Sequence, residues 1–191
     1  MKRTIPFLAL ALAALGAPLV AQTEAPDMEA MMAAAQPGEQ HEMLTKMVGD
    51  WSYTSQMWMA PGSPPMETDG VMKAETLLDG RFVKAVWASE MMGMPFKGIG
   101  INGYDNVKGK FTNVWMDNMG TMMMMFEGDC VDEACSGTSL EAPFTDPATG
   151  AEMTMRMVSS WKSDDQFSVE GFMVTPDGNE FKSMVLEVKR K

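Results

Sequence analysis

The chain has 191 residues, 26 of them acidic and 15 basic, which gives a formal net charge of −11. This length suits one domain with enough residues to bury a core. The acidic balance opposes binding to phosphate backbones and anionic lipid, which both require basic patches, so a nucleic acid is not expected as a partner.

The first 21 residues have the layout of a secretory signal peptide. Lys2 and Arg3 precede an apolar run over residues 5–20, and we expect cleavage after residue 21. The run is shorter than the roughly 20 apolar residues that cross a membrane, and Pro18 interrupts it. These features predict export to the periplasm or the extracellular space, with no membrane insertion after cleavage.

Residues 22–40 predict a flexible linker, because they are mainly Ala, Glu, Met, Gln and Pro and offer little to bury. Within this segment, a transient helix is expected over residues 27–35. Over residues 39–48 the apolar residues fall at helical spacing and Gly49 follows as a stop signal, which predicts one short amphipathic helix. Residues 41–191 are expected to form a single β-barrel domain.

From Trp51 to the end of the chain, apolar residues recur with a period of two, which is typical of strands with one buried face. Short turn signals separate these runs, such as Asp79-Gly80 and Asp177-Gly178. About ten strands joined in sequence predict a mainly β, antiparallel up-and-down meander that closes into a lipocalin-like barrel, since closure removes exposed edges. The short N-terminal helix would cover one end, and a two-sheet sandwich is the alternative.

Cys130 and Cys135 enclose four residues in a chain expected to reach an oxidising compartment. This spacing favours a disulfide that closes a short local loop. The alternatives are a redox switch or a metal site that includes Asp129, Asp132 and Glu133, but the spacing matches no recognised metal motif.

Several segments resemble the bacterial family known as domain of unknown function 1579. They lie over residues 41–51, 78–82, 93–106, 115–121, 146–150 and 177–191. Of these, the middle segment from Gly93 to Asn106 is the most specific. The resemblance covers roughly residues 41–191 and implies a small lipocalin-like barrel, but it implies no reaction, so no catalytic residue is assigned.

Catalytic and cofactor motifs are scarce. His41 is the one histidine, and a surface or capping role is favoured for it, which disfavours triad and His-based metal chemistry. Carboxylate pairs in a barrel mouth could still act as acid and base, but the sequence singles out none. No cofactor is expected.

Methionine is unusually abundant, with 24 in the chain. Thioethers are adaptable apolar groups, so a Met-lined lumen would accept varied ligands. The alternatives are a Cu(I) site, because thioethers are soft ligands, and oxidant scavenging through reversible sulfoxide formation.

We therefore predict an exported protein that holds a small apolar or amphipathic molecule in its lumen. The predicted lining comes from aromatic and Met residues on apolar alternating faces, and the alternative for each is a filled core. The predicted ligand-binding residues are Trp51, Trp115, Met153, Met155, Met157 and Trp161.

Overall fold

The computed structural model describes residues 27–191. Two short helices precede ten strands: α1 (Met28–Ala34), α2 (Glu39–Thr45), β1 (Gly49–Met57), β2 (Met66–Leu77), β3 (Phe82–Met91), β4 (Met94–Asp105), β5 (Lys110–Asp117), β6 (Met124–Cys130), β7 (Thr138–Thr145), β8 (Glu152–Ser163), β9 (Gln166–Val174) and β10 (Glu180–Arg190). The predicted signal peptide lies outside the described residues. Among residues 27–191, no helix is long and apolar enough to cross a membrane.

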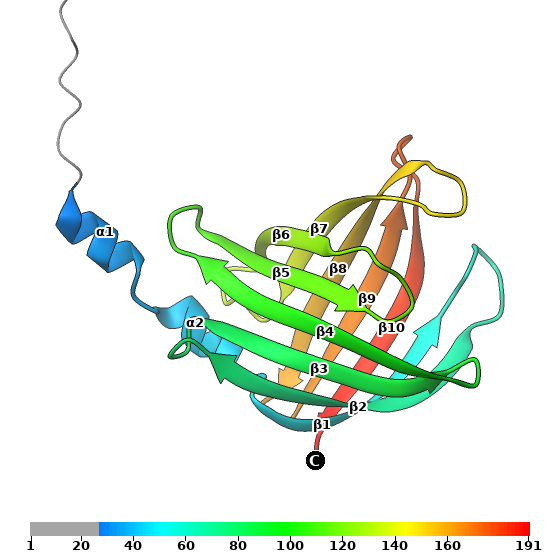
Figure 1. Cartoon of the computed structure of the whole chain (residues 1–191), viewed down its shortest axis with the longest axis horizontal. Helices are drawn as coiled ribbons and strands as arrows, with labels where there is room; N and C mark the ends of the chain where they lie inside the picture. The colour runs from blue at the N-terminus through cyan, green and yellow to red at the C-terminus, as the bar shows by residue number, and fades with distance from the viewer. Residues whose placement is uncertain (1–26) are drawn as a thin grey trace, which may run out of the picture.

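The ten strands form a closed antiparallel barrel in which each strand pairs with its neighbours in sequence and β1 pairs with β10 (Figure 1). The predicted meander barrel is confirmed. Closure follows from the register, because Trp51 to Met57 of β1 pair without interruption with Arg190 to Met184 of β10. Every strand therefore has two partners, and no edge is left open.

The helix predicted over residues 39–48 corresponds to α2, which packs against β3 and β4 at one end of the barrel. The described part of the expected linker contains α1, which projects away from the barrel in Figure 1. Asp27 caps this helix by accepting hydrogen bonds from the backbone N–H groups of Glu29 and Ala30. Asn106 of the β4–β5 turn donates to the carbonyls of Ala34 and Gln36, at 2.9 and 2.8 Å, and so ties the end of α1 to the barrel.

The packed core lies at the end of the barrel that α2 covers, which we call the closed end. Trp51 is completely buried there and packs edge-on against Trp161 and Phe167, with Val188 also buried in the same cluster. The Trp51 indole N–H donates to the Met47 carbonyl at 2.9 Å, which joins the segment after α2 to β1. The opposite end carries the β1–β2, β3–β4, β5–β6, β7–β8 and β9–β10 connections.

Candidate functional site

The barrel encloses a cavity of about 570 Å³, which we call the lumen. Its floor is α2 and the following turn, from which Met43, Leu44 and Met47 contribute side chains. Aromatic side chains from β3 to β5, including Trp87 and Phe96, form part of its wall. The volume falls within the range of small-molecule sites.

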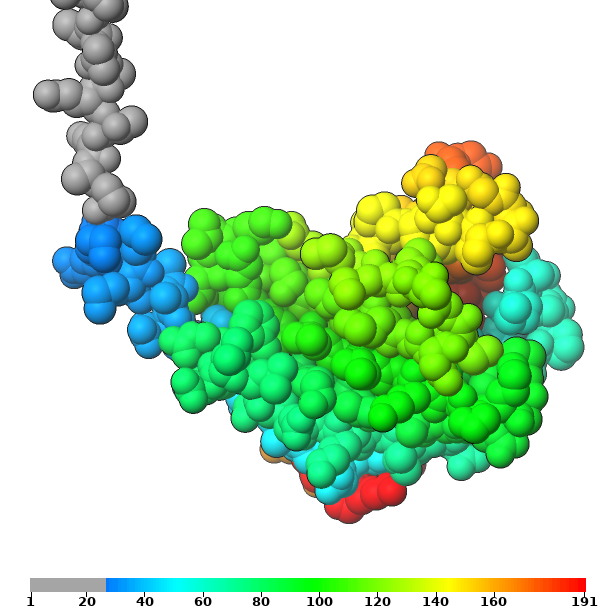
Figure 2. All heavy atoms as spheres, viewed as in Figure 1, coloured from blue at the N-terminus to red at the C-terminus, as the bar shows by residue number. Residues whose placement is uncertain are grey.

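The open end of the lumen, which we call the mouth, lies where the strand connections leave the side opposite α2. Figure 2 shows the surface hollowed between the yellow β7–β8 connection, the yellow-green β5–β6 segment and the cyan β1–β2 connection. Met59 and Met92, from two of the connections at this end, are among the residues that line the lumen. The lumen is therefore open to solvent at this end.

The structure separates the six predicted ligand-binding residues into two groups. Four of them line the lumen: Trp115, Met155, Met157 and Trp161. Trp51 lies instead in the packed core of the closed end. Met153 is at the mouth end of β8, opposite Phe144, and is not part of the lumen wall.

Methionine is concentrated around the lumen and not in the packed core. Within residues 27–191, twelve methionines line the lumen, whereas Met72 is the one methionine among the seven buried apolar residues that do not line it. Sequence reasoning missed Met57, Met66 and Met184 as lining residues. The period-two pattern places Met57 on the face of Tyr53, but the pairing that aligns these three side chains is not visible in the sequence.

The mouth is surrounded by solvent-exposed methionines from the β1–β2, β3–β4 and β5–β6 connections and the adjoining strand ends. They are Met59, Met92, Met94, Met119, Met122, Met123 and Met125. Exposed apolar side chains gathered at one site, and not scattered over a surface, are typical of a binding region.

Two glycines let large rings lie flat against the barrel wall, which keeps the lumen open. A methyl group at Gly70 would lie 2.5 Å from Cζ of Tyr53, so the Tyr53 ring occupies the space above Gly70. The Trp115 ring covers Gly98 of β4 in the same way. Glycine in a strand permits this close approach because it has no side chain.

The lumen is nearly uncharged. Asp117 is the one charged residue among those of the described chain that line it, and no Lys or Arg does so. Its carboxylate accepts hydrogen bonds from the Trp115 indole N–H and the Met119 backbone N–H, both at 2.9 Å. Deeper in the lumen, the Asn113 amide donates to the Asn102 carbonyl oxygen at 2.9 Å. A pair of carboxylates for acid–base chemistry is therefore not assembled in the lumen by the described residues.

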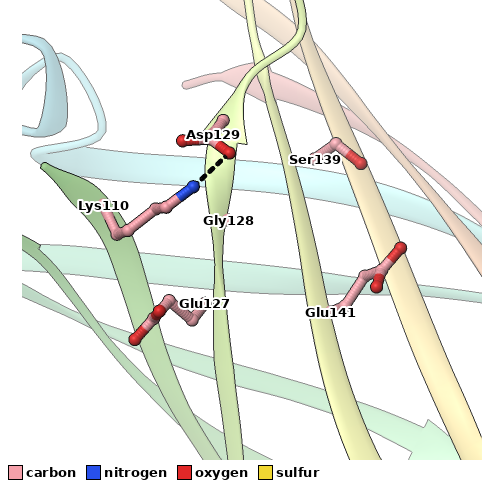
Figure 3. Close-up of a pocket in the computed structure, with 6 residues that line it drawn as sticks. All are labelled: Lys110, Glu127, Gly128, Asp129, Ser139 and Glu141. Carbon is pink, nitrogen blue, oxygen red and sulfur yellow. Dashed lines mark hydrogen bonds and ion pairs between the residues drawn. The ribbon is translucent and has the colours of Figure 1, made fainter. Parts of the chain in front are cut away.

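A second concavity, of about 380 Å³, lies on β5, β6 and β7 and is lined by polar side chains (Figure 3). Lys110 pairs with Asp129 across it at 2.6 Å, while Glu127 and Glu141 extend from neighbouring strands. Glu127 in turn pairs with Lys108 at 2.6 Å. These are exposed surface ion pairs, which contribute little to stability.

The other candidate groups have structural roles. The predicted disulfide is present and links Cys130 to Cys135, with a Cα–Cα distance of 4.8 Å. His41 is buried near the start of α2, where its Nδ1 accepts a hydrogen bond from the Gly38 N–H at 3.1 Å. Within residues 27–191, no three His, Cys, Asp or Glu side chains are grouped as a metal site.

Comparison with solved structures finds matches at low identity. A redesigned beta barrel is 14% identical with a TM-score of 0.40, and the match covers 78% of this chain and 94% of that chain. A protein with unknown function from the DUF3598 family, from Nostoc punctiforme PCC 73102, is 7% identical with a TM-score of 0.22, and the match covers 81% of this chain and all of that chain (100%). No curated protein matches the sequence. The profile of the family described as protein of unknown function (DUF1579) matches residues 36–190, which is most of the chain, so the protein belongs to the DUF1579 family.

Proposed function

We propose that the protein is exported and binds one small apolar or amphipathic molecule in its lumen. The observation that carries this proposal is the cavity of about 570 Å³ with a wall of Met and aromatic side chains and a mouth at one end. Small closed barrels can hold one small ligand in such a cavity. The signal-like pattern over residues 1–21 supports an extracytoplasmic site of action.

The separation between a Met-poor core and a Met-rich lumen supports a binding role for the methionines. A side chain that only fills space is well served by Leu or Val, whose rotamers are better defined. An unbranched thioether adapts its shape to different partners. Methionine at the lumen wall therefore suits ligands of varied shape, and the exposed methionines at the mouth extend the same apolar surface to solvent.

A neutral fluorescent probe, N-phenyl-1-naphthylamine, tests the proposal directly. We expect its fluorescence to rise on binding to the purified protein. Met184→Trp should abolish the rise, because the larger side chain would fill the lumen. Val185→Trp is the matched control, since Val185 is the next residue on β10 and points away from Met184 and the lumen. Equal binding by both variants, each with a folded circular dichroism spectrum, would rule out the lumen as the site.

Native mass spectrometry of protein purified gently from its own host addresses the natural ligand. An added organic mass that Met184→Trp lacks would support the proposal. A protein with only its own mass that also fails to bind the fluorescent probe would contradict it.

A row of methionines in register favours Cu(I) binding as a second candidate function. Met66 of β2 pairs with Met57 of β1, and Met57 pairs with Met184 of β10, so the three lie side by side on the lumen wall. Directly opposed residues have Cβ atoms about 5 Å apart, which is within reach of long side chains that share one ion. The sulfur of Met157 lies next along the row, 3.2 Å from where a methyl group would stand if Gly171 carried one. Thioethers select Cu(I) over harder ions.

Replacement of Met57, Met66 and Met184 together by Leu separates the two functions. The change conserves volume approximately while it removes sulfur. If the row binds Cu(I), the triple variant should lose Cu(I) in a competition titration and keep the fluorescent probe. The matched control is the triple Leu variant of Met28, Met31 and Met32, which are exposed on α1 outside the barrel. Equal Cu(I) affinity in both triple variants would exclude this row as the site.

A further inference from the structure

Three side chains that carry hydroxyl groups lie on one part of the lumen wall. They are Tyr53 and Ser55 of β1 and Ser89 of β3, and we call them the lumen hydroxyl cluster. Tyr53 and Ser55 are only 6% and 4% exposed. The Ser89 Oγ atom is buried without a partner. The cluster stands out because most of the surrounding wall is Met and aromatic.

The register brings these groups together. Tyr53 pairs with Gly70 of β2, and Gly70 pairs with Ser89 of β3, so one glycine separates the two residues across the sheet. The Tyr53 ring lies over Gly70, with the carbon that bears the hydroxyl 2.5 Å from where a methyl group would stand. The ring is therefore directed along the wall from β1 toward Ser89. Ser55 is two residues from Tyr53 on the same face of β1.

A buried hydroxyl without a hydrogen-bond partner, such as that of Ser89, is costly in a folded protein. Most buried polar groups are hydrogen-bonded, so the Ser89 Oγ atom calls for an explanation. Burial raises the pKa of the Tyr53 hydroxyl, the nearby Ser89 hydroxyl opposes this shift, and Asp69 adds to it. Tyr53 is therefore protonated at neutral pH and able to donate.

The charges around the cluster determine which polar groups fit it. No Lys or Arg of the described chain lines the lumen, so a buried carboxylate or phosphate would have no counter-ion. An uncharged hydroxyl or carbonyl can accept from Tyr53 and exchange hydrogen bonds with the serines without that penalty.

We infer that the lumen hydroxyl cluster is the site that binds the polar end of the ligand, and that this end is an uncharged hydroxyl or carbonyl group. The inference rests on the proposed lumen function and narrows it to neutral amphiphiles, such as long-chain alcohols, ketones or esters. The apolar remainder of such a molecule would contact the Met and aromatic wall.

Three probes with the same chain length test this inference: 1-decanol, decanoate at neutral pH, and decane. Each is measured by displacement of N-phenyl-1-naphthylamine from the purified protein. We expect 1-decanol to bind at least tenfold more tightly than decanoate, because only the carboxylate loses its hydration without a partner. Ser89→Ala and Tyr53→Phe should each weaken 1-decanol binding by about tenfold, the effect of one hydrogen bond of about 1.4 kcal/mol, and leave decane unchanged.

Two variants provide matched controls. Tyr104 is the other tyrosine of the chain and lies near the end of β4, outside the lumen lining, so Tyr104→Phe should leave 1-decanol binding unchanged. Ser52 is on the opposite face of β1, where its hydroxyl donates to the Lys189 carbonyl, so Ser52→Ala should do the same.

The outcomes distinguish this inference from the proposed function. If decane displaces the fluorescent probe but decanoate binds as tightly as 1-decanol, or if Ser89→Ala and Tyr53→Phe have no effect, the hydroxyl cluster is not the polar site although the lumen binds ligands. If the fluorescent probe itself does not bind in the lumen, both proposals fail.

Discussion

The guanidinium carbon of Arg190 lies 4.0 Å from the centre of the Trp51 ring at the closed end of the barrel. The same guanidinium donates to the carbonyls of Val48, Lys46 and Asp164, at 2.9, 3.0 and 3.0 Å. It therefore joins the last strand, the first strand, the segment after α2 and the β8–β9 turn. The stacking also covers the buried indole on the side toward solvent.

We expect Arg190→Ala to lower the free energy of unfolding by about 3 kcal/mol, because it removes the cation–π contact and several charge-assisted hydrogen bonds. Arg190→Lys should restore only part of this loss, since an ammonium lacks the planar fork. Urea unfolding followed by tryptophan fluorescence measures both. Arg81→Ala is the control, because Arg81 makes one exposed side-chain hydrogen bond, to Leu78. Equal stability of Arg190→Ala and the unmodified protein would contradict this role.

Gly70→Ala tests whether glycine keeps the lumen wall open. The new methyl group would lie 2.5 Å from both the Ala88 carbonyl oxygen and the Tyr53 ring, so the ring must move into the lumen or the backbone must shift. We expect a loss of about 2 kcal/mol in the free energy of unfolding, as for overpacked sites, together with weaker binding of the fluorescent probe.

Gly38→Ala is the matched control for Gly70→Ala, because nothing lies within 4 Å of a methyl group there and the backbone is not in the left-handed region. Its effect should stay within about 1 kcal/mol. If Gly70→Ala were equally mild and kept full binding of the probe, the Tyr53 ring would not depend on the glycine for its position.

The fold could be predicted from the sequence because two strong signals agree. Period-two alternation continues from Trp51 to the last strand, and tight turn residues such as Asp79 and Gly80 punctuate it. Short connections allow only neighbouring strands to pair, and ten strands in such a meander have one economical way to remove their edges. The local pattern of strands and turns and the overall topology therefore lead to the same prediction, a closed barrel.

The lumen could be predicted only in part, because alternation shows which face a residue occupies but not its height along the barrel. Trp51 is on the inward face but lies in the packed closed end, whereas Trp161 on the same kind of face also reaches the cavity. Met153 follows the alternation of β8 but lies too close to the mouth to line the lumen. The proximity of Tyr53 and Ser89 depends on the register of three strands, which no local pattern specifies.

The disulfide should act as a local stabiliser and not as a requirement for folding. The Cys130–Cys135 bond joins residues five apart. In the chain-entropy model, removing this restraint on the unfolded chain lowers the free energy of unfolding by about 2 kcal/mol. The loop is also held by a backbone hydrogen bond from Val131 to Gly137 at 3.0 Å. The Cys130→Ser/Cys135→Ser double variant should therefore fold and bind the lumen probe.

Reductant provides the control for this variant. It should lower the urea midpoint of the unmodified protein to that of the double variant and leave the double variant unaffected. Failure of the double variant to fold would show that the bond has a larger role than loop closure.

Glu187 should make stability depend on pH in the acid range. The pKa of its carboxyl is lowered, first by the hydrogen bond from Lys162 at 2.7 Å and also by Gln166, while partial burial opposes the shift. Because the pKa is lower in the folded than in the unfolded state, the carboxylate stabilises the protein above the ordinary Glu value of 4.5, and this contribution is lost as pH falls through the lowered value. At the barrel surface the contribution is screened to less than about 1 kcal/mol.

We therefore expect Glu187→Gln to be less stable than the unmodified protein at neutral pH and equally stable once both are well below the carboxyl pKa. Urea midpoints measured across this range at low salt would show the two curves converge in acid. Glu133→Gln, at an exposed position in the disulfide loop, is the control for the loss of one negative charge. A Glu187→Gln offset that grows toward acid would reverse the assigned sign, and a constant offset would show that the Lys162 contact has no titrating effect on stability.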